Sequence, residues 1–69
     1  MEEFKLDDRG YIELNSLLKV TGMIDSGGLA KSLIADGHVT VNGEVELRKR
    51  CKIYTDTIVE FDGQKVHVV

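Results

Sequence analysis

Four positive charges stand within five residues of this 69-residue chain, in the basic run Arg48-Lys49-Arg50-Cys51-Lys52. The net charge of the whole chain is −3, so subtracting these four cations leaves −7 for the remaining residues. A cluster of cations on an otherwise acidic protein favours one local contact with a nucleic acid over indiscriminate binding to polyanions. A charged loop that only meets solvent is the alternative interpretation.

The other chemically reactive side chains form no catalytic or metal-binding pattern. The spacings of His38, Cys51 and His67 match no zinc site. A nucleophilic pair of Cys51 with a histidine would need a concave pocket, which so small a chain offers little room to build. The cations around Cys51 are expected to lower the pKa of its thiol and make it prone to oxidation. We therefore predict a protein that is not an enzyme, with no metal and no cofactor.

The length and composition indicate one small globular domain over residues 1–69. Apolar residues make up 42% of the chain and charged residues 30%, which is ordinary for a folded protein. A single cysteine excludes an internal disulfide and fits a reducing compartment. The acidic N-terminus does not resemble a secretion signal, and no apolar run approaches the roughly 20 residues of a membrane span. We expect a cytoplasmic monomer without membrane contact.

Two helices separated by a short turn are expected before residue 38. The first has three leucines at helical spacing, Leu14, Leu17 and Leu18. Gly22 follows it as a C-terminal stop. The second begins at Asp25-Ser26, either of which can cap its first amides, and ends at Gly37. Its predicted apolar face consists of Leu29, Ala30, Leu33 and Ile34. The short separation predicts a helical hairpin with adjoining apolar faces.

A β-hairpin is predicted next, because Val39 and Val41 alternate with polar residues and Asn42-Gly43 is a strong turn signal. A two-residue loop would pair Val41 with Glu44 and set carboxylates beside the core face. A three-residue loop over residues 42–44 would pair Val41 with Val45. One residue of register decides which face every side chain occupies, so we favour the three-residue loop.

Residues 57–69 predict a second hairpin, with a two-residue loop at Asp62-Gly63. In that register Glu60 lies directly opposite Lys65, a favourable cross-strand charge pair. Residues 4–8 alternate apolar and polar, which favours a short strand at the edge of a sheet. The expected fold class is α+β, with a helical hairpin packed on a small, mainly antiparallel β-sheet.

Residues 14–61 resemble a known family in five places. These are Leu14-Asn15-Ser16-Leu17-Leu18 at a first helix, Gly22-Met23-Ile24-Asp25-Ser26 at a turn, Ala30, Ile34 and Gly37 in a second helix, Val39-Thr40-Val41-Asn42-Gly43 at a strand end, and Asp56-Thr57-Ile58 before a last strand. The pattern resembles the small RNA-binding domain first described in ribosomal protein S-four, often called the αL motif. Thr55 stands where that family usually has a glycine.

The start of the second helix departs from the usual pattern of the family. Where the family has Ser-Arg, this chain has Ser26 followed by Gly27-Gly28. In this respect it is similar to small stand-alone bacterial members of the YbcJ and YaaA type, which carry no catalytic partner domain. The resemblance implies binding to structured RNA, either ribosomal or transfer RNA, and an association with the ribosome, without catalysis.

The residues expected to bind RNA lie at the start of the second helix and in the basic run. They are Ser26, Gly27, Gly28, Lys31, Arg48, Lys49, Arg50 and Lys52. The glycines would leave the helix amides open to a phosphate, which the positive helix end favours. The alternative is that they only shape the turn. Tyr54 either stacks on a base or packs within its strand.

The layout of charge separates two functional hypotheses. For RNA binding, Lys31 and the cations of residues 48–52 should lie on one side of the domain. The acidic residues expected elsewhere are Glu2, Glu3, Glu60 and Asp62. The alternative is a small protein-interaction or assembly module, which predicts an exposed apolar patch and no gathering of cations.

Overall fold

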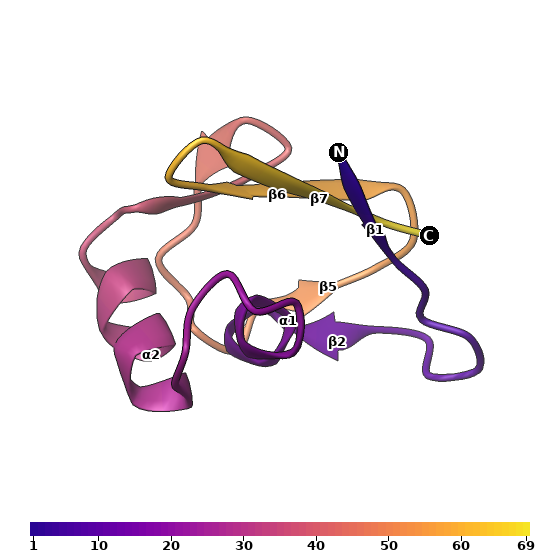
Figure 1. The fold of residues 1–69 in the computed structure, drawn as a ribbon, viewed down its shortest axis with the longest axis horizontal. Helices are drawn as coiled ribbons and strands as arrows, with labels where there is room; N and C mark the ends of the chain where they lie inside the picture. The colour runs from indigo at the N-terminus through magenta and orange to yellow at the C-terminus, as the bar shows by residue number, and fades with distance from the viewer.

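The computed structural model describes residues 1–69, as two layers (Figure 1). One layer is a mixed sheet with the strand order β1-β7-β6-β3-β4. Its strands are β1 (Glu2–Phe4), β3 (Val39–Val41), β4 (Glu44–Val45), β6 (Thr57–Phe61) and β7 (Gln64–Val68). The other layer consists of α1 (Leu14–Val20), α2 (Gly27–Ala35) and a ribbon of β2 (Ile12–Glu13) paired with β5 (Lys52–Ile53). Only β1 and β7 pair in parallel, so the predicted α+β class with a mainly antiparallel sheet is confirmed.

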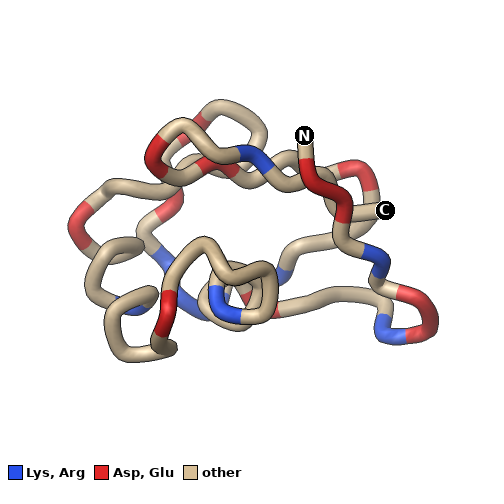
Figure 2. The backbone as a smooth tube through the Cα atoms, in the orientation of Figure 1, with Lys and Arg blue, Asp and Glu red and all other residues tan.

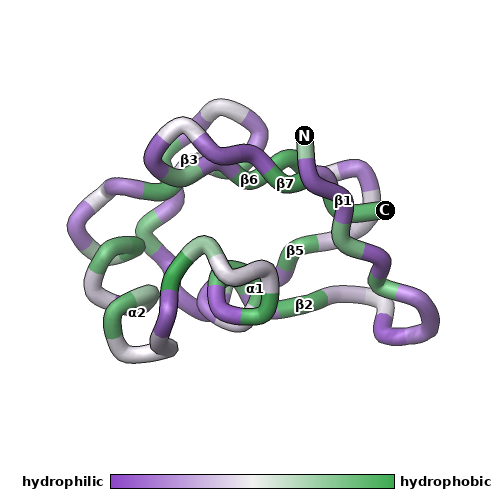
Figure 3. Tube along the Cα trace, viewed as in Figure 1, coloured by the Kyte–Doolittle hydropathy of each residue, from purple (hydrophilic) through white to green (hydrophobic).

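The core lies between these layers and contains thirteen buried residues, all of them apolar. The sheet contributes Val39, Val59, Val66 and Val68, and the opposite layer contributes Leu14, Leu17, Leu18, Ala30 and Ile34. Ile12 and Ile53 of the ribbon are also buried, at 7% and 1% exposure. Figure 3 shows hydrophobic stretches along β6, β7, β2 and β5, the elements on either side of this core. The ribbon is therefore anchored by its two isoleucines.

Both ends of α2 carry the capping signals that the sequence contains. The Ser26 hydroxyl accepts a hydrogen bond from the Leu29 amide at 3.1 Å. Gly37 has a φ of +85°, and its amide donates to the Ile34 carbonyl at 3.0 Å. This left-handed ending favours glycine and confirms the predicted stop.

One residue of the predicted apolar face of α2 lies elsewhere. Leu29 is 51% exposed, whereas Ala30 and Ile34 are fully buried. Residues four apart share a helix face, while a neighbour in sequence is rotated by about 100°. The helix meets the core along Ala30 and Ile34, so Leu29 falls on its flank.

The predicted three-residue loop of the first hairpin is wrong. Val41 pairs with Glu44 and Thr40 with Val45, so the loop contains only Asn42 and Gly43. Their φ angles of 51° and +85° match a type I′ turn, whose twist suits a two-residue hairpin. The prediction assumed that β4 contributes to the core, but both residues of this edge strand are exposed. The Glu44 carboxylate therefore meets solvent, and the two-residue register carries no burial cost.

Asn42 joins this turn to β6. The backbone amide of Asn42 donates to the Ile58 carbonyl at 2.8 Å, and the side-chain Oδ1 of Asn42 accepts from the Ile58 backbone amide at 2.9 Å. The side chain thus completes a reciprocal pair of hydrogen bonds between two strands. The asparagine is suited to the position because it tolerates a positive φ and also supplies an acceptor.

Replacing Asn42 is expected to separate these two contributions to stability. Asn42→Ala loses the hydrogen bond and forces alanine into the left-handed region, for a total of about 2 kcal/mol. Asn42→Gly loses the hydrogen bond but tolerates the backbone angle, so its cost should be about 1 kcal/mol. Urea unfolding of both variants measures the difference. Equal losses would show that the backbone angle contributes nothing.

The second hairpin has the predicted register. Val59 pairs with Val66 and Glu60 with Lys65, around a two-residue loop at Asp62-Gly63. Glu60 and Lys65 lie opposite each other without forming an ion pair within 4 Å.

The N-terminal edge strand is Glu2–Phe4, earlier than the predicted residues 4–8. Neither helix has the length and apolar character needed to cross a membrane.

Candidate nucleic-acid interface

The basic loop, Arg48 to Lys52, is fixed to the start of α1 by its backbone. The Leu14 amide donates to the Cys51 carbonyl at 2.9 Å, and the Asn15 amide donates to the Lys49 carbonyl at 3.0 Å. The first amides of a helix lack partners within the helix, and Glu13 provides no side-chain cap. The carbonyls of the basic loop therefore accept hydrogen bonds from the first two amides of α1, and these bonds hold the loop in place.

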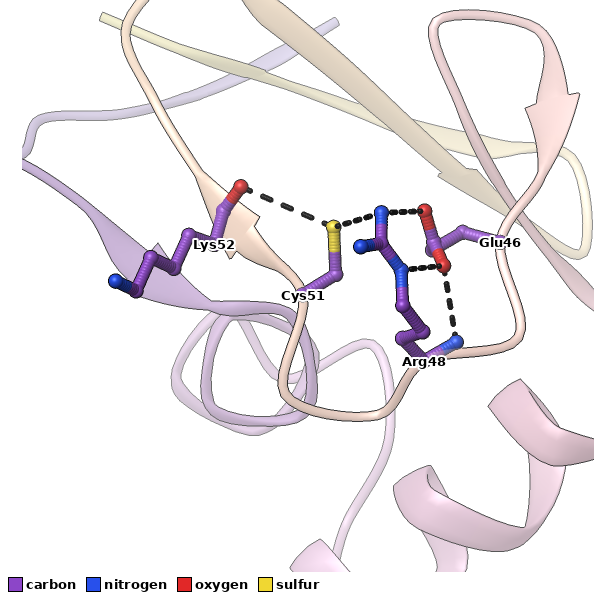
Figure 4. A network of polar contacts seen from close by, with 4 residues as sticks. All are labelled: Glu46, Arg48, Cys51 and Lys52. Carbon is purple, nitrogen blue, oxygen red and sulfur yellow. Dashed lines mark hydrogen bonds and ion pairs between the residues drawn. The ribbon is translucent and has the colours of Figure 1, made fainter.

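Within the basic loop, Arg48 is held by Glu46 (Figure 4). Arg48 Nε lies 2.9 Å from Glu46 Oε2, and Nη2 lies 3.1 Å from Oε1. The backbone amide of Arg48 also donates to Oε2 at 3.0 Å. The bidentate contact between the guanidinium and the carboxylate fixes the direction of the Arg48 side chain and compensates part of its charge. No ion pair engages Lys49, Arg50 or Lys52, so these three cations are free to meet an external anion.

The bond from the Arg48 guanidinium lowers the pKa of Glu46 from 4.5 to about 2. Since this pKa is depressed in the folded state, the contribution to stability is present above pH 4.5 and is lost as the pH falls towards 2. Glu46→Gln removes that contribution. We therefore expect the difference in unfolding free energy between wild type and Glu46→Gln to shrink as the pH falls through this window. Urea unfolding at several pH values measures the difference, and a constant value would contradict the account.

Cys51 does not have the activated thiol that the sequence suggested. Burial raises the pKa of the Cys51 thiol, and the neighbouring Glu46 carboxylate raises it further. Arg48 acts in the opposite direction but has the smaller effect. The expectation of a lowered thiol pKa is therefore wrong, because the thiol is partly buried and an unpredicted carboxylate lies beside the sulfur.

A shallow hollow of about 470 Å³ lies beside the basic loop. Its lining consists of Arg48, Arg50, Cys51, Lys52 and Tyr54. Three cationic residues and one tyrosine thus border one open depression, which suits an anionic group carried next to an aromatic one. No group of three or more histidine, cysteine or acidic residues is placed to hold a metal ion.

The start of α2 forms a second, separate group among the predicted residues. Ser26 already uses its hydroxyl as the helix cap, while the amides of Gly27 and Gly28 have no partner. Neither glycine has a positive φ, and a Cβ built on either meets nothing within 4 Å. Neither the backbone nor the packing therefore requires glycine here. Lys31 is half-buried one turn later, and no hydrogen bond or ion pair joins this group to the basic loop.

The cations of the candidate interface and the named carboxylates belong to different parts of the fold. Glu2, Glu3 and Glu60 lie on the five-stranded sheet, and Asp62 lies in its β6–β7 turn. Lys31 lies on α2, and the basic loop leads from β4 into β5. In Figure 2 the blue stretches of α2 and of the β4–β5 connection lie in the helix-and-ribbon layer.

Sequence reasoning missed two residues of the site, Glu46 and Tyr11. Glu46 precedes Arg48 by two residues, the spacing that places side chains on one face of an extended segment, and this signal identifies the pair. Tyr11 lies with its ring centroid 5.0 Å from Lys52 Nζ. It is distant from Lys52 in the sequence, so only the pairing of β2 with β5 reveals it.

Comparisons with known proteins give consistent matches to this fold. The family model "S4 domain" matches residues 4–69. The Escherichia coli (strain K12) protein named "Putative RNA-binding protein YbcJ" is 48% identical over 69 residues, which cover 100% of this chain and 99% of that protein. The solution structure of YbcJ, described as an αL motif involved in RNA binding, aligns with a TM-score of 0.78 over 100% of this chain and 87% of that one.

Two further matches are more distant. The Bacillus subtilis (strain 168) protein named "Probable ribosome maturation protein RlbA" is 38% identical over 56 residues, or 81% of this chain and 79% of that protein. The crystal structure of the 30S ribosomal protein S4e from Thermoplasma acidophilum aligns with a TM-score of 0.61 at 20% identity, over 81% of this chain and 30% of that one. At this identity the likeness to S4e concerns the fold alone.

Proposed function

The chain belongs to the S4 domain family, and from this premise we propose that it is a non-catalytic RNA-binding protein. The similarity to YbcJ, described as an RNA-binding αL motif, supports this proposal. The observation that carries it is the basic loop, where three unpaired cations project from a backbone fixed to α1. A cationic surface with a fixed backbone binds phosphates without first having to be ordered.

Within the basic loop the cations have different roles. Lys49, Arg50 and Lys52 contact phosphates, and Arg50 is the one that can hold a phosphate in a bidentate manner. Arg48 is oriented by Glu46, so it presents only the part of its guanidinium that the carboxylate leaves free. Phosphate contacts position an RNA without reading its sequence. Recognition by this loop therefore depends on the shape of the RNA.

The start of α2 provides a second contact. The free amides of Gly27 and Gly28 point out of the positive end of the helix, where a phosphate is favoured. Ser26 holds this helix start in shape, and Lys31 adds a cation one turn later. The absence of side chains at residues 27 and 28 allows an RNA backbone to approach closely.

Gly28→Ala is expected to move stability and affinity in opposite directions. Alanine in the first turn of α2 should raise the unfolding free energy by about 0.5–1 kcal/mol, because it restricts the unfolded chain. Its methyl group should lower RNA affinity several-fold, because it holds a phosphate away from the amides. Ser32→Ala, on the exposed middle of the same helix, is the matched control and should leave affinity unchanged. If Gly28→Ala also bound RNA like wild type, the start of α2 would not be part of the interface.

Ribosomal RNA is the target that the comparisons favour over transfer RNA. RlbA is named for ribosome maturation, and it shares 38% identity over 81% of this chain. Crosslinking in cells, followed by sequencing of the recovered RNA, tests both binding and target. We expect ribosomal RNA fragments to be enriched over transfer RNA. The variant in which Lys49, Arg50 and Lys52 are all replaced by alanine should recover neither RNA. Equal recovery by wild type and this variant would contradict the proposal.

A protein-interaction module is the second candidate, because two apolar side chains are exposed near the end of α2. Val45 and Leu47 are 58% and 59% exposed, and both lie within 4 Å of a Cβ built on Gly37. A sheet edge with apolar side chains can accept a partner strand. This candidate would replace RNA binding if wild-type protein recovered no RNA and a protein instead crosslinked to β4.

A further inference from the structure

The two tyrosines of the chain face each other across the β2–β5 ribbon. Ile12 pairs with Ile53 and Glu13 with Lys52, so the same register places Tyr11 opposite Tyr54. Side chains alternate along a strand, and Ile12 and Ile53 point into the core. Tyr11 and Tyr54 therefore lie on the outer face of the ribbon.

The tyrosine pair leaves much of its aromatic surface uncovered. The ring centroids are 6.0 Å apart with planes tilted by 52°, so the rings touch at an angle and do not hide each other's faces. Tyr11 is 39% exposed and Tyr54 is 53% exposed. A pair that only stabilised the core would be more deeply buried. The outer face of the ribbon thus offers an aromatic surface to a ligand.

Cations lie directly beside this aromatic surface. Lys52 Nζ lies over the Tyr11 ring, 5.0 Å from its centroid, and Tyr54 lines the same hollow as Arg50 and Lys52. Tyr54 is therefore the ring with the more open face, and it is also the more exposed of the two. Aromatic rings stack on nucleobases, and arginine and lysine hold the attached phosphates. In a continuous duplex the base faces are covered by stacking, so only an unpaired base can reach a tyrosine ring.

We propose that Tyr54, with Tyr11 packed against it, forms a stacking platform for an unpaired RNA base, with Arg50 and Lys52 on the flanking phosphates. This inference rests on the proposed function and specifies the RNA element, which carries at least one unpaired nucleotide at the point of contact. The competing explanation is that the two rings only stabilise a ribbon whose strands are two residues long.

The composition of the chain provides a direct optical test. It contains two tyrosines and no tryptophan, so its intrinsic fluorescence comes from Tyr11 and Tyr54 alone. We would titrate wild-type protein with an RNA duplex that carries one unpaired adenosine, and with the same duplex lacking it. Stacking is expected to quench the tyrosine emission with the first RNA and to leave it nearly unchanged with the second.

Variants then test the platform by affinity. Tyr54→Ala should weaken binding of the duplex with the unpaired adenosine by roughly 5- to 100-fold, and should change binding of the fully paired duplex less than about twofold. Tyr54→Phe keeps the ring and should bind both RNAs like wild type. Thermal unfolding monitors the fold of each variant. If Tyr54→Ala fails to fold, the quenching of the wild-type protein decides the question.

The failure of this inference is distinguishable from failure of the proposed function. Wild-type protein that binds both duplexes equally well, with unchanged tyrosine emission, would overturn the platform and leave RNA binding by the basic loop intact. Wild-type protein that binds neither these duplexes nor ribosomal RNA fragments would overturn the proposed function, and the platform with it. Three results together support the platform. The RNA with the unpaired adenosine quenches the tyrosine emission of the wild-type protein, Tyr54→Phe keeps the wild-type affinity for this RNA, and Tyr54→Ala loses it.

Discussion

Replacing Lys49, Arg50 and Lys52 together by alanine is expected to lower the affinity for RNA by roughly two orders of magnitude at about 0.1 M salt. Each phosphate contact releases counterions, and log affinity falls by about 0.7 to 0.9 per contact for each tenfold rise in salt. Relative to about 1 M salt, one contact therefore contributes roughly 0.7 to 0.9 log units at 0.1 M. Three contacts give a loss of roughly 100- to 500-fold, which filter binding with ribosomal RNA fragments can measure.

A matched control separates the position of the charges from their number. Lys5, Lys19 and Lys65 lie outside the basic loop, and their joint replacement by alanine removes the same net charge. This variant should lose only a few-fold in affinity, through weaker long-range attraction. If both triple variants lost affinity equally, net charge alone would account for binding, and the basic loop would have no special role.

Ile53→Ala is expected to lower the free energy of unfolding by about 2–5 kcal/mol. Ile53 is 1% exposed and attaches β5 to the core, directly after the basic loop. Its truncation leaves a cavity beneath the ribbon, and the total stability of a domain is typically only about 5–15 kcal/mol. Val45→Ala, on the exposed edge strand, should cost less than about 0.5 kcal/mol and serves as the control. Similar losses for the two variants in urea unfolding would show that β5 is not packed as described.

The sequence predicted the elements whose signals are local. The leucines of α1, the Ser26 cap and the glycine at the end of α2 each act within a few residues. The turn at Asp62-Gly63 fixed the second hairpin in the same way, because the period of two and the turn type agreed. These features could be predicted because nearby residues decide them.

The predicted register of the first hairpin is wrong for a reason that lies outside the hairpin. Its turn signal favours a loop of two residues, whereas keeping Glu44 away from a covered core face favours a loop of three. Whether that face is covered depends on how far α2 and the ribbon extend beneath the sheet, which no local pattern shows. At the edge strand β4 nothing covers it, so the turn chemistry prevailed.

From the sequence, the basic run, the start of α2 and Tyr54 could be named as candidates, but not the contacts that surround them. The β2–β5 ribbon has strands of two residues, too short for any periodicity to be recognised. The pairing of Tyr11 with Tyr54 and the fixing of the basic loop by α1 both depend on contacts between distant segments. Sequence reasoning therefore found the charges but not the surface on which they lie.

The most direct test of the central claim is the salt dependence of RNA binding by the folded wild-type protein and the Lys49, Arg50 and Lys52 triple variant. If the basic loop holds phosphates, a plot of log affinity against log salt should be less steep for the triple variant by about 2.1 to 2.7. Far-ultraviolet circular dichroism should show the same fold for both proteins, since all three side chains are exposed. Two parallel lines would show that these cations release no counterions on binding, and would contradict the assignment of the basic loop as the RNA-binding surface.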